Sequence, residues 1–169
     1  MKEYLNKHIT LEFSDIKNSF SGFLLDFNED WILLRNNSVD YVIDGFVILK
    51  NKNLKAIISN EDNVFLEKVI RLKKIKLTNE FIIPLLSLEN ILTFLTEKYG
   101  LFQIATKRKS AVYLGRLTEI NENELYIEFL NFKGIFDGEI FFKPKKIRVI
   151  EFDTDYVNSL KAYSDHYTS

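Results

Sequence analysis

The sequence has 169 residues, of which 46% are hydrophobic, 28% charged and 14% aromatic, and its formal net charge is −1. The apolar share lies near the globular average, which excludes a disordered chain. A net charge near zero argues against broad attraction to nucleic acid or anionic lipid. The absence of cysteine excludes disulfides and thiolate zinc sites.

No run of about 18 uncharged apolar residues occurs, so the sequence predicts no membrane-spanning helix. The first residues, Met1 to Tyr4, lead into mixed polar sequence without an apolar signal core. We therefore expect a cytoplasmic protein.

The first third of the chain predicts short β-strands. Residues 9–13 alternate apolar and polar side chains with a period of two, which is typical of a strand with one buried face. Turn-forming segments rich in Asn, Asp and Ser separate the apolar runs that follow. The expected strands of this part cover 9–13, 20–27, 31–34, 41–49 and 54–58.

A helical pattern follows these strands. The segment 59–62 (SNED) combines a capping residue with early acids, and the apolar residues after it recur at helical spacing. A second helix is expected after Ser87, with Gly100 as its C-terminal stop. The apolar segment 81–86 connects the two helices.

The last third again predicts strands, followed by a tail with a short helix over 155–163. The expected strands of this part cover 102–106, 112–120, 125–129, 135–142 and 147–152.

An offset of 93 residues relates the two strand-rich parts of the chain. It carries Gly22 onto Gly115 and Gly45 onto Gly138, and apolar and turn residues stay in phase over the stretch 22–57. Gly45 and Gly138 each interrupt a strand pattern, which indicates a bulge or sharp bend where a small barrel turns a corner. We interpret the pattern as an internal duplication of a five-stranded barrel.

The order of one helix and then five strands in the second half resembles the Sm-like fold of Sm, LSm and Hfq proteins. The segment 27–36 (FNEDWILLRN), after Gly22, resembles the second-to-third strand segment of Hfq: a glycine, an aromatic, an acidic turn, and an apolar run ending in a basic residue and Asn. The segment 55–57 (KAI) lies where Hfq has Tyr-Lys-His-Ala-Ile. The resemblance implies tandem, divergent Sm-like domains, and an SH3-like barrel is the alternative that the pattern leaves open.

The RNA-binding motif of that family is not retained. The aromatic residue that stacks RNA bases falls at or beside Asp30, and the Tyr and His of the fifth-strand motif are replaced by Asn53 or Leu54 and by Ala56. In Sm-like proteins the turn between the fourth and fifth strands faces the RNA-binding pore. In the same family the fourth strand of one subunit pairs with the fifth strand of its neighbour.

The expected fold is therefore mainly β, with two tandem five-stranded Sm-like or SH3-like barrels and a helical connector. Residues 1–58 form the first barrel and 59–86 the helical and apolar connector. Residues 87–153 form the second barrel with its N-terminal helix, and 154–169 form the tail.

No residue pattern predicts catalysis, a cofactor or a metal site. His8 and His166 are the two histidines, one near each end of the sequence, and both are expected at the surface. The sequence contains no nucleophile motif and no glycine-rich phosphate loop. We therefore expect a protein that is not an enzyme and holds neither cofactor nor metal.

Two functional hypotheses follow. The first is a non-enzymatic interaction or scaffold protein of unknown partner, which associates with itself through strand edges or aromatic faces. The alternative is an RNA-binding Sm-like module that uses the basic turns between the fourth and fifth strands. The candidate nucleic-acid contacts are Lys50, Lys52, Lys55, Lys143, Lys145, Lys146 and Arg148.

Overall fold

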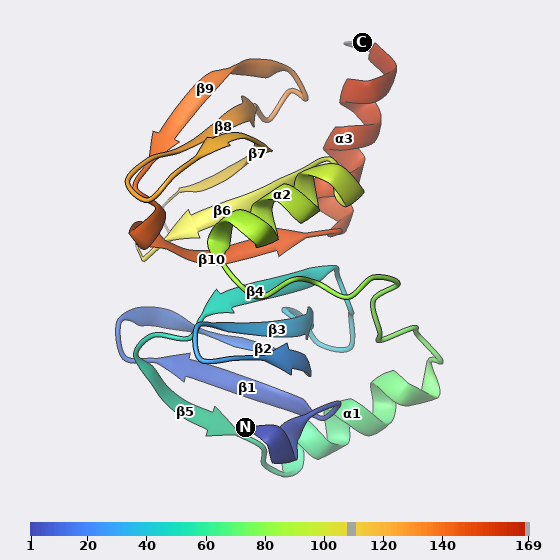
Figure 1. Cartoon of the computed structure of the whole chain (residues 1–169). Helices are drawn as coiled ribbons and strands as arrows, with labels where there is room; N and C mark the ends of the chain where they lie inside the picture. Colours follow the sequence, from blue (N-terminus) through green and yellow to red (C-terminus); the bar gives the residue numbers. More distant parts are fainter. Residues whose placement is uncertain (108–110, 168–169) are drawn as a thin grey trace. The chain divides into compact units, whose positions relative to one another are not determined.

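The computed structural model describes residues 1–107 and 111–167, and these residues form a mainly β structure with three α-helices (Figure 1). The prediction of a mainly β fold is thereby confirmed. The chain divides into two compact units, unit 1 (Met1–Ile82) and unit 2 (Ile83–Ser169). No helix among the described residues is long and apolar enough to cross a bilayer.

Unit 1 contains five antiparallel strands in the order β5-β1-β2-β3-β4. The alternation predicted for its first strand is realised, because Ile9, Leu11 and Phe13 are all buried. Its elements are the short 3₁₀ helix η1 (Lys2–Tyr4), β1 (His8–Phe13), β2 (Ile16–Phe27), β3 (Trp31–Asn36), β4 (Phe46–Lys50), β5 (Leu54–Ile58) and α1 (Glu61–Leu72).

Unit 2 repeats this arrangement, with five antiparallel strands in the order β10-β6-β7-β8-β9. Its expected tail, 154–169, contains one helix, and the last two residues of that tail lie outside the described residues. The elements of unit 2 are α2 (Leu88–Tyr99), β6 (Phe102–Thr106), β7 (Val112–Ile120), β8 (Leu125–Leu130), β9 (Phe136–Phe142), the 3₁₀ helix η2 (Pro144–Lys146), β10 (Ile147–Phe152) and α3 (Asp155–Tyr167).

The strand registers of the two units agree at the offset of 93 residues. Leu24 pairs with Leu34 between β2 and β3, and Leu117 pairs with Ile127 between β7 and β8. The strand register shifts by one residue after Leu24, and the same shift recurs after Leu117. The same offset relates the pairs of β1 with β5 to those of β6 with β10, and the pairs of β3 with β4 to those of β8 with β9.

Gly22 and Gly115 occupy equivalent places where two strands approach closely. A Cβ atom at Gly22 would lie 2.2 Å from the carbonyl oxygen of Arg35, and one at Gly115 would lie 2.3 Å from that of Glu128. Neither distance is compatible with a side chain, so glycine is required at both positions.

The sheets are open, and the expectation of closed barrels is not met in this respect. In unit 1, β4 and β5 lie at opposite ends of the strand order, and no pairing joins them among the described residues. Only residues 51–53 connect the two strands. Such a link reaches about 14 Å, whereas four steps across a flat sheet span about 19 Å. The sheet therefore curls strongly without forming the last hydrogen-bonded ladder.

The expected strand over 41–49 is shorter than predicted. In the structure β4 begins at Phe46, and the residues before it form a loop in which Val39 and Val42 make an isolated bridge. Asp40, between the two bridged residues, and Gly45, after them, both have positive φ, 40° and 61°, so the extended backbone is interrupted at both places. Gly45 thus precedes β4, whereas Gly138, with φ 75°, lies within β9.

Local signals position the helices. Asn60 and Asn63 form a capping box at the start of α1, and the Ser87 side chain accepts the Asn90 backbone N–H at the start of α2. Gly100, with φ 81°, ends α2 as expected.

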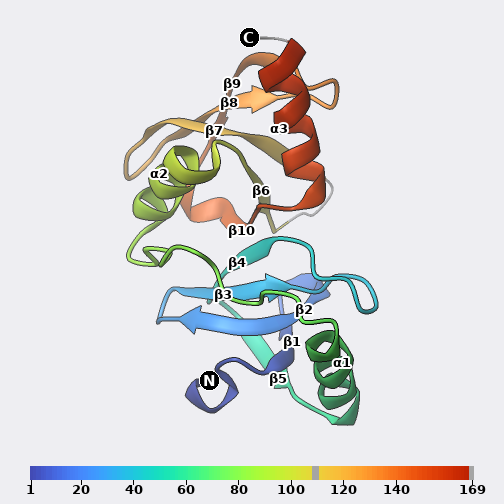
Figure 2. The same cartoon turned by 90° about the vertical axis from the view of Figure 1, so that its right-hand side faces the viewer.

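Each helix is fixed to the sheet of its own unit (Figure 2). The backbone N–H of His8 in β1 donates to Glu67 of α1 at 2.9 Å. The Thr96 hydroxyl of α2 accepts the Leu117 N–H of β7 at 3.0 Å. Val157 of α3 is buried in a cluster with Leu101, Leu114 and Leu130.

Candidate functional site

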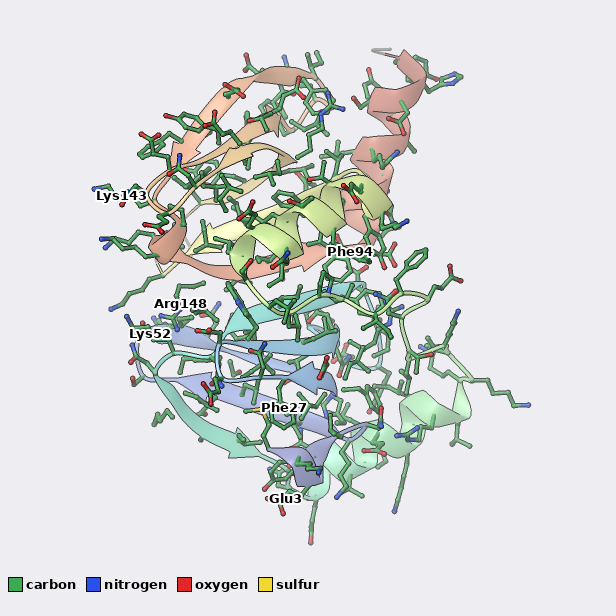
Figure 3. All side chains as sticks on the ribbon, in the orientation of Figure 1. Glu3, Phe27, Lys52, Phe94, Lys143 and Arg148 are labelled. Carbon is green, nitrogen blue, oxygen red and sulfur yellow. The ribbon has the colours of Figure 1, made fainter. Side chains whose placement is uncertain are left out.

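The basic turn of unit 1 is paired with acids. The Lys50 ammonium lies 2.8 Å from the Asp30 carboxylate and 4.5 Å from the centre of the Trp31 ring. Lys55 lies on β5, not on the turn, and its ammonium is 3.3 Å from the Glu12 carboxylate. Lys52 is exposed at the tip of the turn (Figure 3). The positive charge predicted for this turn is therefore partly compensated.

The acidic turn between β2 and β3 is held directly against this basic turn. The Asn28 side-chain oxygen accepts the N–H groups of Asp30 and Trp31 at 2.8 and 2.7 Å, which fixes the acidic turn. The Asn51 N–H donates to the Asp30 carbonyl at 2.7 Å, and the Asn51 side chain donates to the Asn28 carbonyl at 3.1 Å. A phosphate approaching this basic turn would therefore also meet carboxylates.

The corresponding turn of unit 2 presents uncompensated cations. Lys143, Lys145 and Lys146 are exposed, and none of them makes an ion pair within the part of the chain that the structure describes. Figure 3 shows Lys143 at this turn. Arg148, the fourth candidate, is buried on β10 with 4% of its surface exposed, so it does not belong to the exposed set.

A hollow of about 250 Å³ adjoins this turn. Carboxylates and ammonium groups both line it, which makes its charge mixed and not uniformly positive. Its lining residues are Glu122, Asn123, Glu124, Phe141, Lys143, Pro144 and Lys145.

The two terminal strands β5 and β9 carry opposite charges. In the described residues β5 pairs with β1 alone and β9 with β8 alone, so each strand has one edge without a partner strand. β5 (LKAII) contains Lys55 and no acid, whereas β9 (FDGEIFF) contains Asp137 and Glu139 and no base. Asp137 and Glu139 are exposed. Unpartnered strand edges are templates for pairing with another chain.

The expectation that His8 lies at the surface is wrong, whereas His166 is exposed as expected. His8 has 1% of its surface exposed, because α1 and the loop after β3 cover the face of β1 on which it lies. Its Nε2 lies 2.9 Å from the Asn37 side-chain oxygen, and its Nδ1 lies 3.1 Å from the Asn63 side-chain nitrogen. The neutral tautomer with a proton on Nε2 satisfies both contacts.

Burial lowers the pKa of His8 below its ordinary value of 6.5. The hydrogen bond to Asn37 and the charge of Glu67 oppose this shift. His8 is therefore held neutral, as a structural link between three elements of unit 1.

The sequence carries a trace of this network that does not by itself indicate burial. Thr10 shares the face of β1 with His8, and its hydroxyl contacts the Ser21 hydroxyl at 2.8 Å and accepts from the Asn63 side chain at 3.2 Å. Small polar residues at alternate positions are usually read as a solvated face. Here they form a polar layer between β1 and the first turn of α1, in which His8 and Asn63 are buried and Thr10 is half-buried.

No cluster of three or more potential metal ligands occurs in residues 1–107 and 111–167. A scan against protein-family models, a search of curated proteins and a search of solved structures each found no match to this chain.

Proposed function

We propose that the chain is a non-enzymatic interaction protein that associates with copies of itself by placing β9 of one copy against β5 of the next. The opposite charge of the two unpartnered edges carries the proposal, with Lys55 on β5 against Asp137 and Glu139 on β9. The pair of Lys55 with Glu12 is exposed to solvent, so the ammonium stays accessible to a partner. Complementary charge favours contact between different edges and disfavours contact of an edge with its own kind. The absence of cysteine suits a reducing, cytoplasmic setting.

Such a contact joins two different surfaces, so it is heterologous and propagates into a closed ring or an open filament. The positive φ of Gly138 limits how far β9 can pair as a regular strand. The contact is therefore expected to be short and sensitive to the charges beside it.

An internal duplication of an Sm-like fold is part of the same proposal. The equal strand orders and the registers that agree at the offset of 93 support it. In this assignment β9 is the fourth strand of unit 2 and β5 is the fifth strand of unit 1. These are the two strands through which neighbours meet in Sm-like proteins.

Light scattering on the size-excluded protein tests the proposal. We expect a concentration-dependent oligomer for the unmodified chain. Lys55→Glu and Glu139→Lys each place like charges on facing edges, so each weakens self-association by about tenfold or more. The double variant, in which the charges are exchanged, recovers it.

Lys2→Glu is the matched control, because Lys2 is exposed on η1 and belongs to neither β5 nor β9. This variant should self-associate like the unmodified protein. A monomer at high concentration, or a double variant no better than either single one, would contradict edge pairing.

RNA binding is a second candidate, which the uncompensated Lys143, Lys145 and Lys146 favour. Filter binding to uridine-rich and adenine-rich RNA tests it, with binding expected to weaken as salt is raised. Lys146→Glu should weaken binding more than Lys50→Glu, because Asp30 already compensates Lys50. No binding at low salt would end this candidate.

A further inference from the structure

An exposed apolar surface on unit 1 lies apart from the strand edges. It combines the loop between β3 and β4 with the N-terminal half of α1, and each of its five residues is 41 to 59% exposed. We call it the α1–loop surface. Its residues are Val39, Tyr41, Val42, Val64 and Phe65.

Two contacts join the loop to the helix. The rings of Tyr41 and Phe65 meet edge to face with their centres 6.3 Å apart. The Lys73 ammonium, just after α1, donates to the Tyr41 carbonyl at 2.9 Å. The apolar side chains therefore form one continuous surface.

The polar network around His8 fixes the loop between β3 and β4 relative to α1. Asn37 contacts His8 through its side-chain oxygen, and its side-chain nitrogen donates to the carbonyls of Asp40 and Val42 at 2.9 and 2.8 Å. Asn63 of α1 contacts the other ring nitrogen of His8. The imidazole thus connects the loop to the helix, and a surface organised in advance loses little entropy on binding.

A hollow of about 500 Å³ opens beside the helix part of this surface. Val64 and Phe65 supply its apolar wall, Lys68 supplies a cation at one end and Glu61 an acid at the other. A hollow with an apolar wall accepts a protruding side chain more readily than it accepts a flat surface.

Positive charge gathers toward the C-terminal end of α1. Lys68, Lys73 and Lys74 are exposed and make no ion pair with an acid of the described chain. The other cations there are compensated, since Arg71 pairs with Glu67 and Lys76 with Glu80. Leu72, 81% exposed, lies among the uncompensated lysines.

We propose that the α1–loop surface binds a peptide segment of another protein, in which an aromatic or aliphatic anchor enters the hollow and carboxylates face Lys68, Lys73 and Lys74. Charge complementarity identifies the partner as acidic. The hollow favours a peptide over a membrane, because it accepts a single protruding side chain. Glu61 and Asp62 at the start of the helix require the carboxylates of the peptide to lie toward the C-terminal end of α1, where the lysines are. The site contains no residue of β5 or β9, so its binding is measured independently of self-association.

A random-peptide display library selected on the full-length chain tests the proposal, with peptides that also bind Phe65→Gln removed by counter-selection. We expect the enriched peptides to combine acidic residues with aromatic or aliphatic ones. A synthetic enriched peptide should bind about tenfold or more weakly to Phe65→Gln and to Lys68→Glu, and more weakly at high salt.

Phe132→Gln and Lys146→Glu are matched controls, because both residues are exposed in unit 2. They should bind the peptide like the unmodified chain, and circular dichroism should show all four variants folded. Enrichment of basic or uncharged peptides, or no enrichment, would overturn the proposal. So would binding to phosphatidylserine vesicles that Phe65→Gln abolishes, or loss of self-association in Phe65→Gln, since these assign the surface to a membrane or to a second copy.

Discussion

At the scale of single residues, Gly22 and Gly115 show why the two sheets bend alike. Each stands where the backbone of the neighbouring strand fills the space of a Cβ atom, at 2.2 and 2.3 Å from a carbonyl oxygen. The resulting close approach of β2 to β3, and of β7 to β8, helps each long strand to curl over its neighbour. The requirement is steric, so no other residue type satisfies it.

We therefore predict that Gly22→Ala and Gly115→Ala each lower the free energy of unfolding by about 1–3 kcal/mol, the range of overpacking substitutions. Gly138→Ala is the comparison, because a Cβ there meets nothing within 4 Å and only its φ of 75° is unfavourable. Its cost should be near 1 kcal/mol. Urea denaturation measures all three, and an unchanged midpoint in Gly22→Ala would contradict the close approach.

The folded structure disfavours the protonated, charged form of His8. Both ring nitrogens are engaged, and protonation of Nδ1 would set an N–H against the N–H donor of Asn63. The charged groups facing His8 are Glu67 of α1, which accepts its backbone N–H, and Arg71, which pairs with Glu67 and lies over the Phe23 ring that contacts His8. The two ring nitrogens of His8 meet amide side chains, those of Asn37 and Asn63, and not carboxylates.

This arrangement gives the stability of unit 1 a definite pH dependence. The pKa of His8 in the folded state is lowered, so the unfolded chain binds the proton more tightly. The stability that depends on neutral His8 is fully present above the unfolded pKa of about 6.5. It is lost progressively as the pH falls from that value toward the folded pKa.

Denaturation at a series of pH values between about 5 and 7.5 tests this dependence. His8→Gln, which cannot titrate, should flatten the profile, although it also lowers the stability at neutral pH. His166→Gln should leave the profile unchanged, because His166 is exposed on α3. Equal profiles for the His8 variant and the unmodified protein would exclude His8 as the group responsible.

At the scale of elements, α1 is attached to unit 1 through its first turn. The Asn63 side chain accepts the Asn60 N–H in the capping box of the helix, donates to His8 and to Thr10, and is itself buried. Because one side chain serves the cap and the buried network together, α1 should detach when it is lost.

Asn63→Ala is predicted to cost about 1–3 kcal/mol, since it leaves buried polar groups without their partner. Hydrogen exchange should show reduced protection of α1 and of the loop between β3 and β4. Asn158→Ala on α3 is the matched control, because Asn158 makes only exposed contacts, and its cost should be small. Loss of protection confined to the first residues of α1 would show that Asn63 acts as a cap alone.

The sequence predicted these elements well where a local signal determines them. Ser87 and Gly100 bound α2 as expected, and 54–58 is a strand with the predicted limits. The loop at 37–45 was not predicted, because it depends on the Asn37 side chain donating to three carbonyls and on the positive φ of Asp40. The buried state of His8 depends on where α1 packs, which no local pattern encodes. Sheet closure likewise depends on curvature accumulated over five strands.

At the scale of the whole molecule, the two units have the same order of five strands but different residues at their surfaces. The turns at Asn28 and Asn121 are built alike, each side chain accepting two backbone N–H groups. The surfaces differ, since the basic turn of unit 1 is compensated by Asp30 and that of unit 2 is exposed. Because the open edges of β5 and β9 carry opposite charges, one copy of the chain is suited to bind the next through these two edges.

Site-specific disulfide formation tests that assembly most directly, because the natural chain has no cysteine. Copies carrying Ala56→Cys on β5 are mixed with copies carrying Glu139→Cys on β9 under mild oxidation. Adjacent strands bring Cα atoms to the separation of about 5.5 Å that a disulfide needs. We predict a linked dimer from the mixture and little from either variant alone or from Lys2→Cys mixed with Glu139→Cys. Linkage no faster than in that control would contradict the pairing of β5 with β9.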